Sequence, residues 1–523
     1  MLLLGIIELP LWLLFIVTIV FLFYIYTSRK HSIFARYRLP FVEPSPFFGC
    51  FKHLAQKGVM QSEYDATLKY GKVVGFFLGN LPTIFVTDPE IIRELFVKRY
   101  NEFHSRSQAA GVTKYWEKTI LMASRLEYWK FLRTTMTPSF TSGKLRRMED
   151  IIIGGIDRTL KGITIKLGPE KEAVFDMFPV YRDLTLEIIC QAALGVEING
   201  NNSVDELKQQ VTKMLSYSLE KNPMLTMLFL IPDLKHVYNF FDIDYNDTKA
   251  IAYVSDALKQ VIQDRKLDKG CKKQDLLQLM INTQQENSKS NAKTEETDET
   301  EETEKLKTDD KLSRGMTDDE IIANAILFLF AGNDTTSTAL VFTTYFLAVH
   351  QDLQDELVQE INEKVGTTEV SYDIIQTLTN LDMFVSESMR LYPPVTRINR
   401  QITKEVKVSD FTLPRNISLT VPVYTIHRLA EYWPEPEKFD PNRFSAENKS
   451  NIQPYTYLPF GTGPKSCLGM RFANMELKMT IVKLLQNFKI KPSPDLQIPP
   501  KLEKNIFCRP IGGMKLTLEK RSS

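Results

Sequence analysis

The sequence is poor in cysteine and lacks the spacings that cysteine and histidine take at zinc sites. Cys50, Cys190, Cys271, Cys467 and Cys508 are scattered over 523 residues, with no CxxC pair and no HExxH motif among them. An odd number of widely separated cysteines argues against a disulfide framework, a structural zinc site and a zinc hydrolase. The body of the chain is therefore expected in a reducing compartment.

Nucleotide-binding loops and a large excess of charge are also missing. No G-x-G-x-x-G follows a strand and no Walker loop occurs, so a flavin or nicotinamide domain within the chain is not expected. The net charge is +1, which gives no indication of nucleic-acid binding. The hydrophobic fraction of 43% is that of a globular protein with a large core.

One long hydrophobic run is present, at the N-terminus. Residues 2–26 are almost all apolar, and the basic residues follow this run instead of preceding it. That order predicts a transmembrane signal-anchor over 1–28 with the rest of the chain in the cytosol. The alternatives are a buried core helix and an uncleaved leader. A basic, proline-rich linker at 29–48 then leads to one large domain at 49–523.

Three later segments organise that domain. Residues 72–89 form two apolar runs around a Gly-Asn pair, which predicts a β-hairpin. Residues 285–315 are polar and charged, and this composition predicts a solvated or disordered connector. A capping box of Thr317 and Glu320 then opens an apolar run of about 30 residues. Because the run is apolar nearly all round, it predicts a central buried helix, with a second membrane span as the alternative.

The middle of that expected helix carries the segment AGNDTT. Gly332 leaves room beside the backbone, and Asp334 and Thr335 place an acid and an alcohol next to the gap. Buried acids often mark functional sites. The alternative is a structural kink in which the threonine hydroxyl bonds the carbonyl four residues earlier.

Two other patterns lie downstream. Glu387 and Arg390 are three residues apart between apolar flanks, which predicts a buried pair with Arg443 as a further partner. In the stretch FGTGPKSCLG, Cys467 lies among three glycines. Glycines let a backbone lie close against a flat group, and a thiol on such a loop is usually there for its chemistry.

Taken together, these motifs resemble the cytochrome P450 family of haem-thiolate monooxygenases over essentially the whole chain. Segments 137–145, 427–444 and 469–478 resemble its microsomal, drug-metabolising branch. The resemblance implies a mainly α (α+β) cytochrome P450 fold, with a triangular helical body and a small β-rich subdomain. It also implies one haem b (iron protoporphyrin IX), with O2 and NADPH as co-substrates.

The resemblance assigns roles to individual residues. Cys467 matches the axial thiolate ligand of the haem iron, whose electron donation favours O–O cleavage. Asp334 and Thr335 match the acid–alcohol pair that supplies protons during oxygen activation. The structural triad on the proximal side matches Glu387, Arg390 and Arg443.

Residues expected to contact the haem come from several segments. The two propionates need cationic partners, and one departure from the family pattern is Lys465, where arginine is usual. Lysine keeps the charge but loses the planar two-pronged contact, so haem binding is expected to persist but to weaken or shift. Backbone N–H groups of Leu468 and Gly469 are expected to point at the sulfur. The full set of expected haem contacts is Arg106, Trp129, Arg133, Ala331, Arg400, Phe460, Gly461, Lys465 and Gly469.

Electrons must come from another protein, because no electron-transfer domain is expected in the chain. The resemblance implies the membrane-bound NADPH–cytochrome P450 reductase, with cytochrome b5 as an auxiliary donor, at the endoplasmic reticulum membrane. Candidates for a basic docking face, each of which fits a solvated surface equally well, are Lys130, Lys144, Arg146, Arg147 and Lys478.

Substrate identity is weakly encoded. An apolar pocket predicts lipophilic small molecules such as xenobiotics, steroids or fatty acids. Residues 224–231 form an apolar run that fits a membrane-dipping lid or a plain buried segment. The alternatives to a monooxygenase are a reductase-independent P450 isomerase or peroxide-rearranging enzyme and a haem carrier. Residues expected to line the pocket are Leu121, Met122, Leu327, Phe330 and Val395.

Overall fold

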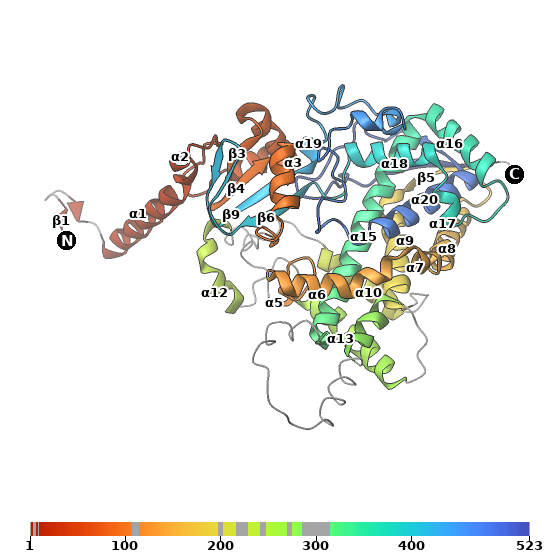
Figure 1. The fold of residues 1–523 in the computed structure, drawn as a ribbon, viewed down its shortest axis with the longest axis horizontal. Coiled ribbons are helices and arrows are strands. Elements are labelled where there is room, and N and C mark those ends of the chain that lie inside the picture. The colour runs from red at the N-terminus through yellow and green to blue at the C-terminus, as the bar shows by residue number, and fades with distance from the viewer. Residues whose placement is uncertain are drawn as a thin grey trace, which may run out of the picture.

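A single exposed helix projects from the body of the molecule (Figure 1). This helix, α1 (Leu11–His31), begins after Pro10 and ends with three basic residues. Only 6% of its most apolar window is buried, and side chains such as Phe15 and Phe21 are exposed. The predicted anchor therefore forms a helix long and apolar enough to cross a membrane. The computed structural model describes residues 2–3, 7–8, 10–106, 114–196, 202–215, 229–240, 247–268, 275–284 and 314–521.

Next to the anchor lies a four-stranded sheet in the order β3-β4-β9-β6 (Figure 1). The hairpin prediction is confirmed, because the first two of these strands pair antiparallel from Val73↔Val86 to Leu78↔Leu81 around Gly79 and Asn80. The sheet packs with α3 on a core of its own. The elements of this region are α2 (Ile33–Arg36), α3 (Phe51–Tyr70), β3 (Val73–Leu78), β4 (Leu81–Val86), α4 (Pro89–Arg93), β6 (Arg397–Ile402), β7 (Val406–Val408), β8 (Phe411–Leu413), β9 (Ile417–Pro422) and α19 (Val423–Ile426).

The larger part of the molecule is helical and is built around α15 (Asp318–Val349), which runs through its middle (Figure 1). The capping box is confirmed: the Thr317 hydroxyl accepts from the Glu320 N–H, and the Glu320 carboxylate accepts from the Thr317 N–H. Within this helix, 72% of the most apolar window is buried by protein. The central buried helix is therefore confirmed, and the membrane-span alternative is not needed.

Helices from distant parts of the sequence pack on α15 and form a second core. A small sheet, β10-β11-β5, closes the far end near the C-terminus. The elements of this body include α5 (Lys114–Glu117), α6 (Leu126–Met136), α7 (Ser142–Arg146), α8 (Glu149–Leu167), β5 (Glu172–Asp176), α9 (Met177–Leu194), α10 (Asn202–Leu215), α12 (Lys235–Phe240), α13 (Thr248–Leu267), α16 (Gln351–Lys364), α17 (Tyr372–Ile375), α18 (Thr379–Leu391), α20 (Met470–Asn487), β10 (Phe488–Pro492) and β11 (Lys515–Lys520).

Two sequence predictions fall mainly outside the described residues. Of the expected connector at 285–315, only Arg314 and Gly315 are described. Of the apolar run at 224–231, Phe229, Leu230 and Ile231 are described. The first two of these are buried, and the carbonyl of Phe229 accepts from the backbone N–H of Asn80 at 2.9 Å. This end of the run therefore packs against the hairpin turn.

Candidate active site

The cysteine loop is a tight turn that leads into α20. Its first and last parts are joined by a hydrogen bond from the Cys467 N–H to the Phe460 carbonyl at 2.9 Å. Gly461 and Gly463 have φ values of 72° and 71°, a region that favours glycine. A Cβ at Gly463 would lie 2.4 Å from the carbonyl oxygen of Phe96, so no larger residue fits there. The glycines are therefore required both by the turn and by close packing.

The sulfur at the end of this loop is accessible, unlike the other described thiols. Cys467 is exposed, whereas Cys50, Cys190 and Cys508 are buried. The surrounding protein still desolvates the thiol and raises its pKa, and the Gly469 N–H and the Arg133 guanidinium act in the opposite direction. A donor N–H and nearby positive charge favour the thiolate, which is the form that binds metals.

Beside the sulfur lies a cluster of buried cations that form no ion pair with any acid in the described part of the chain. Arg400 and Lys465 are 2% and 7% exposed, and Lys465 Nζ, Arg400 Nε and Arg106 Nε have no hydrogen-bond partner. Burial and the neighbouring arginines lower the pKa of Lys465 to about 6 and that of Arg400 to about 9. Burial also lowers the pKa of Arg106 to about 10. No carboxylate among the described residues forms an ion pair with any of the three.

Two further residues of the expected haem site, Trp129 and Arg133, lie at the same place. Lys465 Nζ lies 5.3 Å from the centre of the Trp129 ring, and Arg133 donates to the carbonyl of Ser466 at 3.0 Å. Arg106 and Arg133 both act electrostatically on Cys467. Buried cations without acids need an anionic ligand. The two propionates of a haem fit these cations, and its iron fits the Cys467 thiolate.

On α15, the segment AGNDTT interrupts an otherwise buried helix with the exposed residue Ala331. The room expected beside Gly332 is filled by Ile189 of α9, because a Cβ at Gly332 would lie 2.7 Å from that side chain. The Thr335 hydroxyl donates to the carbonyl of Ala331 at 2.6 Å. The structural alternative, in which the Thr335 hydroxyl bonds the carbonyl four residues earlier, is therefore observed. This bond places the hydroxyl beside the exposed residue Ala331.

Asp334 has a partner that sequence analysis missed. Its Oδ2 accepts from Arg509 at 2.7 Å, and its Oδ1 is buried without a partner. Arg182 on α9 lies near both groups, and burial lowers its pKa while the carboxylate raises it. Arg509 is 175 residues away from Asp334 in the sequence and follows no recognisable motif, so no spacing rule could have indicated the pair.

The three residues of the predicted structural triad, Glu387, Arg390 and Arg443, are in contact through the Glu387 carboxylate, and the first two are completely buried. Arg390 donates to both carboxylate oxygens of Glu387, at 2.7 and 2.8 Å, and both side chains have 0% exposure. Arg443 Nε lies 3.4 Å from the same carboxylate. Arg390 also donates to the carbonyls of His427 and Lys438.

His427 joins the triad to the segment that precedes the cysteine loop. Its Nε2 accepts from the Leu458 N–H at 2.8 Å, and its Nδ1 lies 3.0 Å from the Arg390 carbonyl. Burial lowers the pKa of this histidine to about 3, so the ring is neutral and donates from Nδ1. The sequence offered no motif for this connection.

The residues expected to line a substrate pocket are partly brought together. Phe330 contacts the rings of Trp116 and Phe507 at 6.4 and 6.1 Å, and Val395 pairs with Phe507 in a β-bridge. Sequence analysis missed these two aromatic residues. Leu121, Met122 and Leu327 belong to the core that includes Phe330.

One residue predicted for the basic face that docks the electron donor, Lys478, is wrong. Lys478 is only 6% exposed and pairs with Asp382 at 2.7 Å, so its charge is not available on a docking face. Arg146 pairs with Asp373 at 2.8 Å, whereas Lys130 is exposed. A long apolar stem buried in the helical core explains the low exposure of Lys478.

Comparisons with known proteins agree with this geometry. The sequence model of the family described as Cytochrome P450 matches residues 39–518. Cytochrome P450 3A18 of Rattus norvegicus is 34% identical over 98% of both chains. Cytochrome P450 3A13 of Mus musculus is 33% identical over 98% of this chain and 96% of its own. Lithocholate 6-beta-hydroxylase of Mesocricetus auratus is 33% identical over 95% of this chain and 94% of its own.

Proposed function

The chain belongs to the cytochrome P450 family and is a haem-thiolate monooxygenase that uses O2, and we propose that it oxidises lipophilic small molecules with electrons from NADPH. Two electrons would arrive through a reductase, one oxygen atom would enter the substrate, and the other would leave as water. Xenobiotics, steroids and bile acids are the proposed substrate classes. Bile acids are included because one relative is named as a lithocholate hydroxylase.

A single observation carries this proposal: an accessible thiol lies beside buried cations that lack acids. Cys467 would ligate the haem iron, and Arg106, Arg400 and Lys465 would receive the propionates. The bound haem would supply the oxygen-activating chemistry. The Gly469 N–H, which bonds to the sulfur, would tune its electron donation.

The residues on α15 would handle protons. Asp334 is proposed to move protons between solvent and the reaction site, with Arg509 fixing one of its oxygens. Thr335 is proposed to offer its hydroxyl beside the exposed residue Ala331. A backbone carbonyl that accepts from a threonine side chain is a common cause of local helix opening, and it leaves space for water.

The membrane and the electron donor are part of the same proposal. The exposed apolar face of α1 supports a single-pass anchor in the endoplasmic reticulum, with the catalytic domain at 49–523 on the cytosolic side. NADPH–cytochrome P450 reductase is the proposed donor and cytochrome b5 an auxiliary one. Lys130, which is exposed on α6 and forms no ion pair with a described residue, is one candidate for the docking face.

The ligand assignment is tested by the difference spectrum of the reduced protein with carbon monoxide. The wild type should show the Soret band of thiolate ligation, and Cys467→Ser should lose it. Cys50→Ser, a change at a buried thiol elsewhere, is the matched control and should keep it. Retention of the band in Cys467→Ser would refute the assignment.

The reaction type is tested with labelled oxygen. The full-length protein is placed in vesicles with the reductase and NADPH, and it is offered a panel of bile acids, steroids, fatty acids and drugs. A monooxygenase transfers one atom of ¹⁸O2 to the product and depends on the reductase. Product formed from a peroxide substrate without reductase or label would instead support the peroxide-rearranging alternative.

A further inference from the structure

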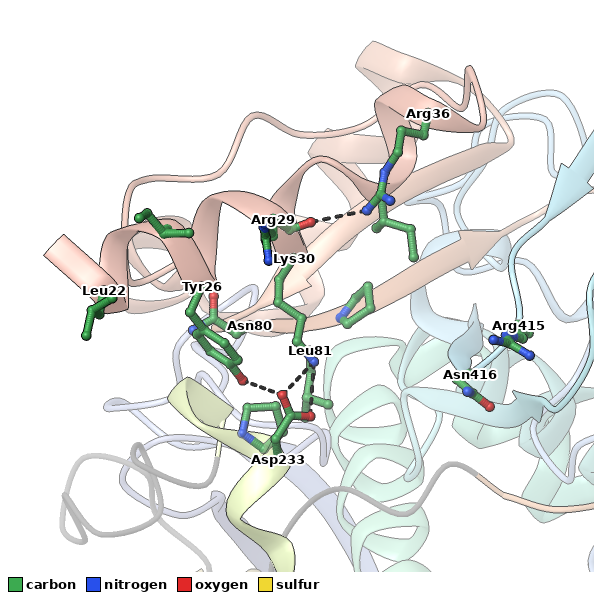
Figure 2. Close-up of a pocket in the computed structure, with 14 residues that line it drawn as sticks. Leu22, Tyr26, Arg29, Lys30, Arg36, Asn80, Leu81, Asp233, Arg415 and Asn416 are labelled. Atoms are coloured by element: carbon green, nitrogen blue, oxygen red, sulfur yellow. Dashed lines mark hydrogen bonds and ion pairs between the residues drawn. The ribbon is translucent and has the colours of Figure 1, made fainter. Parts of the chain in front are cut away.

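A cavity lies where the anchor helix meets the body of the protein (Figure 2). It has a volume of about 680 Å³, is open to solvent on one side, and is lined by the end of α1, the turn between β3 and β4, and the segments around Asp233 and Arg415. These segments are far apart in the sequence, and none of them belongs to the candidate active site. The cavity therefore needs an explanation of its own.

The polar part of the cavity is strongly positive. Four cationic side chains and one carboxylate line it, which gives a net charge of +3. The carboxylate, Asp233, is already held by Lys30 at 2.9 Å and by the hydroxyl of Tyr26 at 2.8 Å. Figure 2 shows these contacts, with Arg415 across the cavity from the helix. The remaining cations are Arg29, Arg36 and Arg415.

These three arginines have no acidic partner among the described residues. Arg36 donates to the carbonyl of Arg29 at 3.2 Å, and no ion pair is formed by Arg29 or Arg415. The carbonyls at the end of α1 carry about half a negative charge, which offsets only a small part of the +3. An anion with several acceptor oxygens is the ligand that such a site lacks.

The apolar part of the lining comes partly from the anchor helix and partly from the sheet. Leu22 and Ile25 come from α1 and continue the exposed apolar face of the anchor, and Leu81 and Pro82 come from β4. Arg29 and Lys30 follow directly on the same helix, and Arg36 ends α2 just after it. The cavity thus changes from apolar to cationic along the direction in which a bilayer changes from acyl chains to headgroups.

We propose that this cavity binds the phosphate headgroup of an anionic phospholipid, with the upper part of its acyl chains against Leu22 and Ile25. The inference rests on the membrane anchoring proposed above. A soluble phosphate would use the arginines alone and would leave the apolar lining without a role. A lipid uses both, and it would join the anchor to the sheet through Arg29 and Arg415.

The test measures lipid preference in the full-length protein. The haem-loaded protein is reconstituted in phosphatidylcholine vesicles with a trace of spin-labelled phosphatidylserine or spin-labelled phosphatidylcholine. The fraction of immobilised label gives the preference for the anionic lipid. Arg415→Gln removes one cavity cation and should lower this preference about fivefold. Arg38→Gln is the matched control, because Arg38 is exposed in the linker and does not line the cavity.

A second variant should act in the opposite direction. Asp233→Asn removes the single carboxylate and frees Lys30, so the preference for phosphatidylserine should rise about fivefold. Both variants should keep the carbon monoxide spectrum and the turnover of the wild type in phosphatidylcholine alone. These controls show that the variants are folded and that the active site is intact.

Three results would overturn the inference. An equal loss in Arg38→Gln and Arg415→Gln would mean that only general surface charge attracts the lipid. Release of the label by inorganic phosphate, but not by chloride at equal ionic strength, would assign the site to a soluble anion. Failure of the wild type to float with the vesicles would refute the anchoring itself, and flotation is measured before any lipid preference.

Discussion

Two of the buried carboxylate–arginine pairs in the described part of the chain, Glu387 with Arg390 and Asp334 with Arg509, differ in how completely their polar atoms are satisfied. In the pair of Glu387 and Arg390, both carboxylate oxygens and all three guanidinium nitrogens have partners. In the pair of Asp334 and Arg509, the second carboxylate oxygen and the guanidinium Nε have none. Glu387 and Arg390 both lie on α18, whereas Asp334 lies on α15 and Arg509 in the segment between β10 and β11.

This difference in hydrogen bonding indicates different roles for the two pairs. A saturated buried pair has no better arrangement to adopt, so it fixes the elements that it joins. A pair with free lone pairs can exchange partners with water or a second donor at low cost, as a proton-carrying group must. The difference therefore fits a structural role for the first pair and the proton-transfer role proposed for the second, which lies next to Thr335.

The largest effect is expected from breaking the saturated pair. Arg390→Leu leaves the Glu387 carboxylate buried without its main partner and should lower the free energy of unfolding by about 3–5 kcal/mol. Denaturant unfolding and the yield of haem-loaded protein measure this. Arg93→Leu, which removes an exposed pair with Glu90, is the control and should cost about 0.5 kcal/mol or less. Similar losses of unfolding free energy in Arg390→Leu and Arg93→Leu would show that the buried pair is not especially important for stability.

Removing the acid of the other pair should affect activity and not folding. Asp334→Asn keeps the shape and should retain the carbon monoxide spectrum, while product formation falls about hundredfold because a proton donor is lost. The measurements are product per NADPH and the solvent isotope effect. Asp319→Asn neutralises an exposed carboxylate on the same helix and should behave as the wild type. A loss of haem in Asp334→Asn would place this pair with the structural one.

His427, which bonds to the backbone of Arg390, should also make the free energy of unfolding fall at acid pH. The folded-state pKa of His427 is about 3, below its ordinary 6.5, so below pH 6.5 the unfolded chain binds a proton that the folded chain does not. Stability is therefore lost as pH falls from 6.5 toward 3, by about 1.4 kcal/mol per pH unit from this group. Unfolding free energies at pH 5 and 7 measure it.

Two glutamine variants isolate that contribution. His427→Gln can still accept from Leu458 and donate to the Arg390 carbonyl, and its stability should depend less steeply on pH than that of the wild type. His53→Gln, at an exposed histidine, should keep the wild-type slope. Equal slopes in all three proteins would show that His427 titrates normally.

The smallest effect is expected at the partner of Asp334. Arg509→Gln replaces a charged donor with a neutral one and should lower product per NADPH about fivefold, with the spectrum and substrate binding unchanged. Arg509→Lys keeps the charge and should restore most of the loss. A change in substrate binding without a change in product per NADPH would assign Arg509 to the pocket.

The contacts that follow from sequence spacing alone lie within one element or one short loop, whereas the contact of Arg443 with Glu387 is expected from the need for a further partner and from the family resemblance. The capping box of Thr317 and Glu320, the hairpin, and the pair of Glu387 and Arg390 follow from spacing, because helices and turns fix which neighbours meet. The contacts of Asp334 with Arg509 and of Lys30 with Asp233 span 175 and 203 residues. Such contacts depend on how the helices and strands pack together. No fixed separation along the sequence identifies the two partners.

The unpartnered cations beside Cys467 have a consequence for biosynthesis. A newly made chain that folds before it meets its cofactor must hold Lys465, Arg400 and Arg106 together against their mutual repulsion. If the haem propionates bind these cations as proposed above, binding of this dianion would remove that penalty and would protect the folded chain from proteases. The amount of folded enzyme would then depend on the supply of haem.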